Sequence, residues 1–131
     1  MPVQVHPDQT TEWQLEKHKG DPDGPVFILG PLTGFEAAGL FAKHQAIADG
    51  DTDAAGRCYE DTIRAGLRGW RNVFGADGKP VEFQANPKGR PKAESLAVIA
   101  RDWITVYGLA EAILGNAMMT KADLGNSKPA S

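Results

Sequence analysis

The most regular pattern of hydrophobic and polar positions lies in the C-terminal third of the chain. From Leu96 onward, apolar residues recur in strictly alternating steps of three and four residues. The residues on these steps are Leu96, Ile99, Trp103, Val106, Ala110, Ile113 and Ala117. Such spacing places the side chains in one stripe on a helix that packs lengthwise against another helix. The pattern predicts one long C-terminal helix, with Gly108 as its expected point of bending.

The N-terminal part instead alternates with the period of a β-strand. Trp13 and Leu15 fall on one face of an extended segment, and the polar residues between and beside them fall on the other. A turn cluster rich in Gly, Asp and Pro follows at 20–25, and a short apolar run follows at 26–29. Because glycine permits positive φ and proline fixes φ, the cluster favours a chain reversal. Residues 11–29 are therefore predicted to form a β-hairpin.

Two shorter helices are predicted after this hairpin. Thr33, with a glutamate three residues later, has the pattern of a capping box that begins a helix over about 34–48. A glycine ends this helix, and either Asp51 or Asp53 caps the next one. The second helix is predicted over about 52–69, because apolar residues recur there at three- and four-residue steps.

The remaining segments complete a mixed α+β fold. An Asp-Gly turn within 73–83 predicts a second small hairpin, and 84–91 is predicted to be a polar loop. The expected architecture is an N-terminal β-hairpin, two short helices, a small second hairpin and a long C-terminal helix. The expected organisation is a flexible arm over 1–10, a single α+β domain over 11–124 and a disordered tail over 125–131.

Length and composition are those of an ordinary globular domain. The chain has 131 residues, of which 41% are hydrophobic and 24% charged, and its formal net charge is −3. A domain of this size builds a core without disulfide bonds, and the single cysteine, Cys58, fits a reducing compartment. No signal-peptide pattern or membrane-length apolar run is present. The expected localisation is the cytoplasm, with no membrane partner.

No group of residues has the spacing of a catalytic or metal site. The three histidines lie far apart in the sequence, and Cys58 has no CxxC partner. The Asp51-x-Asp53 pair resembles the start of a calcium loop, but Thr62 stands where a bidentate glutamate is required. No nucleophile signature or glycine-rich phosphate-binding motif occurs. We expect no catalytic residue, no metal ion and no cofactor, and therefore a protein that is not an enzyme.

A basic segment at 88–92 is the one feature that suggests nucleic-acid binding. Single-stranded nucleic acids are bound where aromatic residues are interleaved with such charges, and this segment contains none. A solvated loop is the preferred interpretation, and no nucleic-acid partner is expected. Trp103 is a better candidate for binding, because it lies in the middle of the long apolar stripe and tryptophan is a frequent interface anchor. The alternative for Trp103 is core packing.

Four short segments resemble the tail assembly chaperone group of long-tailed bacteriophages. They are 27–36 (FILGPLTGFE), 66–73 (GLRGWRNV), 77–83 (DGKPVEF) and 109–114 (LAEAIL), the last followed by Asn-Ser near the end of the chain. In particular, a Gly-Leu-x-Gly-Trp motif followed by Asp-Gly-x-Pro-Val-x-Phe is similar to a pattern common in that group. The likeness covers roughly residues 26–127.

The resemblance implies a non-enzymatic role in phage tail assembly within the host bacterial cytoplasm. Such chaperones are thought to coat the tape measure protein before the tail tube polymerises around it, so the tape measure protein and the tail tube protein are the implied partners. The alternative is a minor structural or adaptor subunit retained in the virion, and self-association into a homo-oligomer is a further option. The candidate partner-binding residues are Leu96, Ile99, Trp103, Val106, Ala110, Ile113 and Met118.

Overall fold

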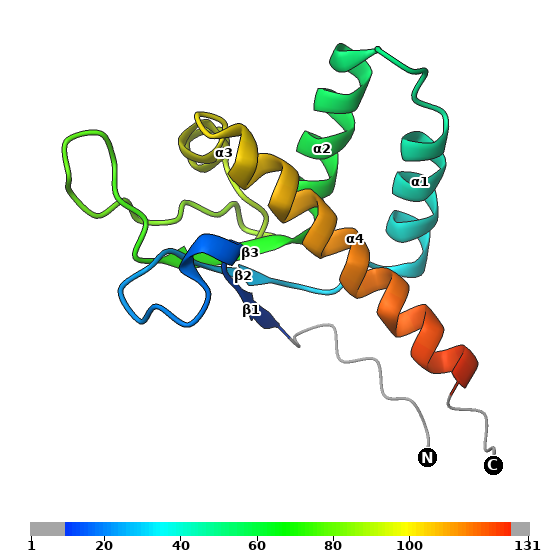
Figure 1. Ribbon diagram of the computed structural model, residues 1–131, viewed down its shortest axis with the longest axis horizontal. Helices are drawn as coiled ribbons and strands as arrows, with labels where there is room; N and C mark the ends of the chain where they lie inside the picture. The colour runs from blue at the N-terminus through cyan, green and yellow to red at the C-terminus, as the bar shows by residue number, and fades with distance from the viewer. Residues whose placement is uncertain (1–9, 127–131) are drawn as a thin grey trace.

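A three-stranded antiparallel sheet lies against a set of helices in the computed structural model, which describes residues 10–126 (Figure 1). The strand order is β1-β2-β3, with strands β1 (Thr11–Trp13), β2 (Val26–Leu29) and β3 (Leu67–Arg71). The helices are α1 (Gly34–Gln45), α2 (Thr52–Gly66), α3 (Ala93–Ile99) and α4 (Trp103–Asn126), and a 3-10 turn, η1, spans Glu16–His18. The predicted α+β class is confirmed.

The predicted N-terminal hairpin forms, but its first strand is shorter than the alternating pattern indicated, because β1 ends at Trp13, before Leu15, and Glu16–His18 form η1. Strand β1 pairs antiparallel with β2, and Glu12 lies opposite Ile28. The turn cluster between the strands is closed by local hydrogen bonds, one of which runs from Gly24 N to Asp21 O at 3.1 Å. The two strands belong to a three-stranded sheet, because β2 pairs with β3 along its other edge.

Strand β3 corrects the prediction that the second helix continues to residue 69. Helix α2 ends at Gly66, and the next residue, Leu67, begins the strand. Pairing with β2 places Leu67 opposite Leu29 and Trp70 opposite Phe27. The apolar residues that fit the helical period are therefore buried as part of a strand. Strand pairing therefore overrides the helical period at this point.

The predicted helix caps are present. Thr33 Oγ1 accepts a hydrogen bond from Glu36 N at 3.1 Å, and the glutamate accepts one from Thr33 N at 3.0 Å, which completes the capping box of α1. Asp51 begins α2, because its Oδ1 accepts from Ala54 N at 3.0 Å. Helix α1 ends at Gln45, three residues before the predicted end at 48.

The predicted continuous helix from Leu96 is divided into α3 and α4, which is a second correction. Asp102 lies in the interruption and binds the start of α4: its carboxylate accepts from Ile104 N at 3.2 Å and from Thr105 Oγ1 at 2.6 Å. A side chain that satisfies free N–H groups in this way starts a new helix. The seven apolar residues of the predicted stripe are therefore divided between two helices. Leu96 and Ile99 lie on α3, and the others lie on α4.

The predicted second hairpin is reduced to one isolated bridge between Phe74 and Pro80, supported by a hydrogen bond from Val81 N to Val73 O at 2.8 Å. Trp70 holds this loop against the sheet, because its indole Nε1 donates to Val81 O at 2.7 Å.

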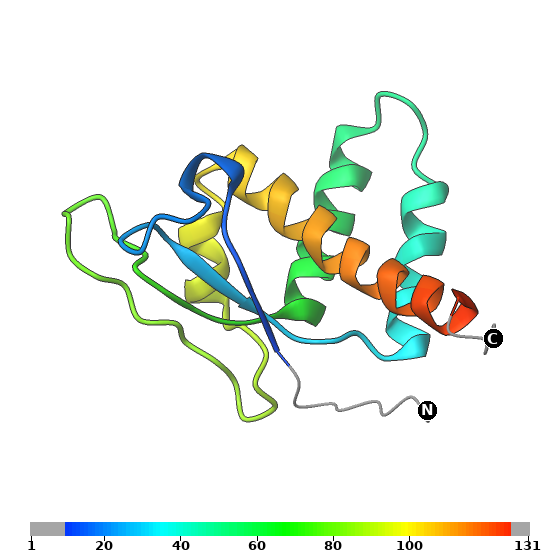
Figure 2. The ribbon, with the colours of Figure 1, turned by 60° about the horizontal axis from the view of Figure 1, so that its bottom comes forward.

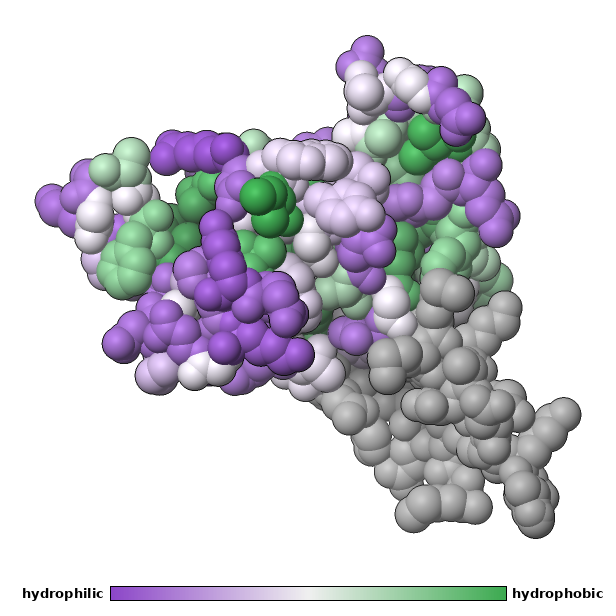
Figure 3. All heavy atoms as spheres, in the orientation of Figure 1, coloured by the Kyte–Doolittle hydropathy of each residue, from purple (hydrophilic) through white to green (hydrophobic). Residues whose placement is uncertain are grey.

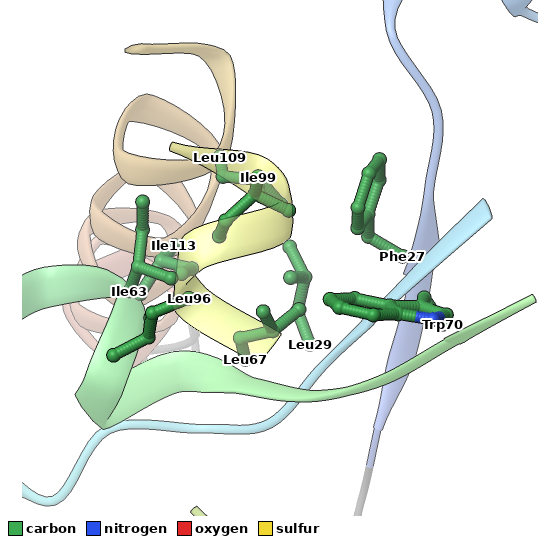
Figure 4. Close-up of a cluster of buried hydrophobic side chains, with 9 residues drawn as sticks. All are labelled: Phe27, Leu29, Ile63, Leu67, Trp70, Leu96, Ile99, Leu109 and Ile113. Atoms are coloured by element: carbon green, nitrogen blue, oxygen red, sulfur yellow. The ribbon is translucent and has the colours of Figure 1, made fainter. Parts of the chain in front are cut away.

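The hydrophobic core lies between the sheet and the helices (Figure 4). Strands β2 and β3 present their side chains to those of α2, α3 and α4. The buried cluster is Phe27, Leu29, Ile63, Leu67, Trp70, Leu96, Ile99, Leu109 and Ile113. Helix α4 crosses α2 and reaches α1 (Figures 1 and 2), so it contacts both of the preceding long helices.

Two glycines allow close approaches to α4. A Cβ atom at Gly66, the last residue of α2, would overlap the side chain of Ile113, at 2.8 Å from its Cγ1. A Cβ atom at Gly108 would lie 2.8 Å from the Trp13 ring, so this glycine is a contact point for β1. Gly108 therefore provides room for a neighbouring tryptophan.

The termini are described only in part. The predicted arm over 1–10 lies outside the described residues except for Thr10, and the predicted tail over 125–131 lies outside them from residue 127 onward. Helix α4 continues through Asn126, so it includes the first two residues of the predicted tail.

Candidate partner-binding groove

An open groove of about 570 Å³ lies between the first three turns of α2 and the junction of α3 with α4. Its lining is predominantly apolar at the base and charged along the rim. The lining residues are Thr52, Asp53, Gly56, Arg57, Tyr59, Glu60, Ile63, Leu96, Ile99, Ala100, Arg101, Trp103 and Val106. Its size falls within the range of sites that bind other molecules.

Buried aliphatic side chains form the base of the groove. Ile63 of α2 is 2% exposed, and Leu96 and Ile99 of α3 are also buried while still lining the groove. These three residues belong to the main hydrophobic core. The base is therefore rigid, because any change in it also changes the packing of the domain.

The α2 wall is low at its centre. Gly56 has no side chain, and a Cβ atom built there would meet no atom within 4 Å. The wall begins at a fixed point, because Asp51 caps the N-terminus of α2. A partner can consequently approach the α2 backbone closely at Gly56.

Trp103 forms the opposite edge of the groove and is largely exposed, at 62% of its surface. Its ring lies 5.7 Å from Tyr59 and 5.5 Å from Tyr107, measured between ring centroids. The exposed residues Ile104 and Tyr107 extend this surface along α4. On the face shown in Figure 3, hydrophobic and near-neutral side chains gather over the first half of α4, whereas the loop after β1 is hydrophilic.

The aromatic side chains are held by contacts between α1, α2 and α4. The ring of His44 on α1 lies 5.6 Å from that of Tyr59, measured between centroids, in a tilted arrangement. The His44 Nε2 atom lies 3.4 Å from the buried Thr62 hydroxyl. Burial lowers the pKa of His44, and the negative charge of Glu111 opposes this change. A hydrogen bond to Glu111 raises the pKa of Tyr107. Tyr59 therefore stands in a network that fixes the position of the Trp103 ring.

The structure separates the predicted binding residues into two sets. Leu96, Ile99, Trp103 and Val106 line the groove together. Ala110 and Ile113 are buried within the domain, at 0% and 2% exposure, and do not line the groove, which corrects the expectation of one outward-facing stripe. The two sets differ because α4 packs across α2, so that the part of the apolar stripe that follows Val106 in the sequence faces the core. The side chain of Met118 lies outside the described residues.

The sequence did not indicate the wall formed by α2. In the sequence, Gly56 and Arg57 on this wall and Arg101 on the opposite rim carry no pattern that marks them as site residues. Their common signal is weak, because a glycine and two arginines on a helix surface are typical of solvent-facing positions. The groove becomes visible only when α2 and α3 are placed side by side.

Among residues 10–117, whose side chains the structure describes, no three His, Cys, Asp or Glu side chains gather in a way that would hold a metal ion. Cys58 is buried, and burial raises the pKa of its thiol. No helix in the described part of the chain is both long and apolar enough to cross a membrane.

Comparison of the chain with protein-family models, curated proteins and solved structures returned no match.

Proposed function

We propose that this protein is a non-enzymatic assembly factor that holds an apolar helical segment of another protein in the groove between α2 and α4. The observation that supports it is the position of Trp103, a largely exposed tryptophan at the edge of a groove whose base is aliphatic. Exposed apolar surface of this kind marks interaction sites, and tryptophan is a frequent anchor in them.

The dimensions of the groove suit a helix. Its α2 wall extends from Thr52 to Ile63, a length of about 17 Å at the usual rise of an α-helix. A partner helix of about three turns would place apolar side chains at i, i+3, i+4 and i+7 along it. The proposed role is to cover such a segment until its own assembly buries it.

The resemblance to tail assembly chaperones names the partner within this proposal. The partner is the tape measure protein of a long-tailed phage, bound in the host cytoplasm before the tail tube forms around it. The second candidate function is a minor structural or adaptor subunit of the tail. Mass spectrometry of purified virions distinguishes the two, because a transient chaperone is absent from finished particles and a subunit is present.

Two matched substitutions test the groove. Trp103→Asp places a charge at the groove edge, and Phe35→Asp places the same charge on another exposed aromatic residue, which is 94% exposed in the first turn of α1. An acidic residue is tolerated at both positions because it lies near a helix N-terminus. Co-expression with the tape measure protein followed by affinity purification should show loss of the complex for Trp103→Asp only.

Circular dichroism and thermal unfolding first establish that both variants are folded. If folded Trp103→Asp protein still retains the tape measure protein at the wild-type level, the groove is not its binding site. If Phe35→Asp abolishes binding instead, the site lies at the start of α1.

A further inference from the structure

The rim of the groove carries two arginines that face the same opening from different walls. Arg57 projects from the second turn of α2, and Arg101 lies in the segment between α3 and α4. Among residues 10–117, whose side chains the structure describes, neither guanidinium takes part in an ion pair. Both groups are exposed, so each is available to a charge on an incoming partner.

One of the two acidic residues on the same rim is paired with a cation. Glu60 forms an ion pair with Arg64, at 3.3 Å between Oε1 and Nη2. Asp53 lies in the first turn of α2, where the unpaired backbone N–H groups of a helix stabilise a negative charge. Outside ion pairs, the rim residues whose side chains are described are two arginines and one aspartate, so the balance of charge around the groove is positive, although the whole chain has a formal net charge of −3.

We infer that the occupant of the groove is an amphipathic helix of another protein whose apolar stripe is flanked by acidic side chains. This inference rests on the proposed function and adds the charge of the ligand to it. The apolar stripe covers Leu96, Ile99 and Val106, and the flanking carboxylates approach Arg57 and Arg101. Arginine suits this role because its planar guanidinium binds a carboxylate through two parallel hydrogen bonds.

The two arginines also explain how a largely apolar groove discriminates between partners. Aliphatic contacts favour any hydrophobic helix, whereas a basic residue beside Arg57 or Arg101 meets like charge and is disfavoured. Gly56, which precedes Arg57 and also lines the groove, lets the backbone of the bound helix approach α2. The groove therefore selects by charge at its rim and binds by hydrophobic contact at its base.

Three synthetic helical peptides test the inference against the full-length protein. They share one leucine stripe with i, i+3, i+4 and i+7 spacing and differ only at the flanking positions, which carry Glu, Gln or Lys. Fluorescence anisotropy should show that the Glu peptide binds about three- to tenfold more tightly than the Gln peptide, the scale of two exposed ion pairs. The Lys peptide should bind most weakly, and the differences should shrink at high salt.

Paired variants assign the charge effect to the rim. The double variant Arg57→Gln/Arg101→Gln should remove the preference for the Glu peptide. The control Lys79→Gln/Lys88→Gln removes the same charge from exposed positions in the loops outside the groove and should keep the preference. Equal loss in both double variants would show a general charge effect and would overturn the inference.

A blocking variant separates the inference from the proposed function. Gly56→Leu fills the groove, whereas Gly39→Leu makes the same change in the middle of α1, where an added Cβ also meets no atom within 4 Å. If all three peptides bind equally and Gly56→Leu alone blocks them, the groove is confirmed and the acidic preference is wrong. If none of the peptides binds, both are wrong. Self-association in sedimentation experiments that Gly56→Leu abolishes would identify a second copy as occupant and would also overturn the inference.

Discussion

The side chain of Ile113 on α4 packs directly against the backbone of Gly66 at the end of α2, in space that a Cβ atom would occupy. Both residues are buried, and Ile113 belongs to the central hydrophobic cluster. The absence of a side chain at Gly66 therefore sets how closely the two helices that support the groove approach each other. Changes at this contact should affect stability before they affect binding.

Gly66→Ala should destabilise the protein. The added methyl group overlaps Ile113 in a well-packed core, and overpacking of this kind costs about 1–3 kcal/mol. Chemical denaturation monitored by circular dichroism measures the change in the free energy of unfolding. Gly56→Ala provides the control, because its Cβ meets no neighbour and should stabilise α2 by about 0.5–1 kcal/mol through helix propensity.

A double variant tests whether the overlap itself is the cause. Combining Gly66→Ala with Ile113→Val should give less destabilisation than the sum of the two single changes, because the smaller side chain relieves the overlap. Additive effects would show that the cost of Gly66→Ala arises elsewhere, for example in the turn from α2 to β3.

Asp102 should contribute to stability through the start of α4. Asp102→Ala removes the acceptor for Ile104 N and Thr105 Oγ1 and should cost about 1 kcal/mol, as loss of an N-terminal helix cap does. Asp102→Asn keeps an acceptor and should cost less. Equal losses in the two variants would contradict a capping role for this side chain.

The same residue should make stability fall in acid. The hydrogen bond from Thr105 lowers the pKa of Asp102 in the folded protein, so the unfolded state binds the proton more readily. The stabilisation is present above the unfolded pKa of about 3.9 and is lost as the pH falls through the lower folded pKa. The stability difference between wild type and Asp102→Asn should therefore shrink between pH 6 and pH 2.

His44 should produce a second pH effect in a higher range. Because burial lowers its pKa below the usual value of about 6.5, protonation is easier in the unfolded chain. The stabilisation that neutral His44 gives to the contact between α1 and α2 is fully present above about pH 6.5, and it is lost as the pH falls through the lower folded pKa. Denaturation curves at pH 7.5 and 5.5 should show a smaller difference for His44→Gln than for wild type. An unchanged difference would assign the effect to another group.

Trp103 should report occupation of the groove through its fluorescence. It is largely exposed, whereas Trp70 is buried and Trp13 is half-buried, so covering the groove changes the environment of Trp103 most. Addition of a bound peptide should shift the emission maximum to shorter wavelength. Trp103→Phe should lose most of this shift, and a full shift in that variant would place the ligand elsewhere.

Much of the fold could be predicted from local patterns. The alternation at Trp13 and Leu15 predicted β1, and the Thr33 capping box predicted where α1 begins. These signals are complete within a few neighbouring residues, so the sequence carries them without knowledge of the rest of the fold. Strand β3 could not be predicted in this way, because the spacing of Leu67 and Trp70 continues the helical pattern of α2. Only hydrogen bonding to β2, a segment distant in the sequence, makes these residues a strand.

The sequence predicted one wall of the candidate site but not the other. The apolar period identified Leu96, Ile99, Trp103 and Val106, since hydrophobic spacing is visible in a single segment. It could not show that Asp102 divides that segment, nor that Ile113 turns inward to meet α2. The opposite wall carries no hydrophobic signal, because a missing side chain at Gly56 and a charge at Arg57 become features of a groove only in three dimensions.

The contact between Trp13 and Gly108 joins a strand near the start of the chain to a helix near its end. During synthesis, the first strand emerges long before its partner on α4 exists. The tryptophan therefore stays without its final covering until α4 has left the ribosome. It follows that the native fold is completed after synthesis of α4, and that a nascent chain stalled before this helix exposes apolar surface to other proteins.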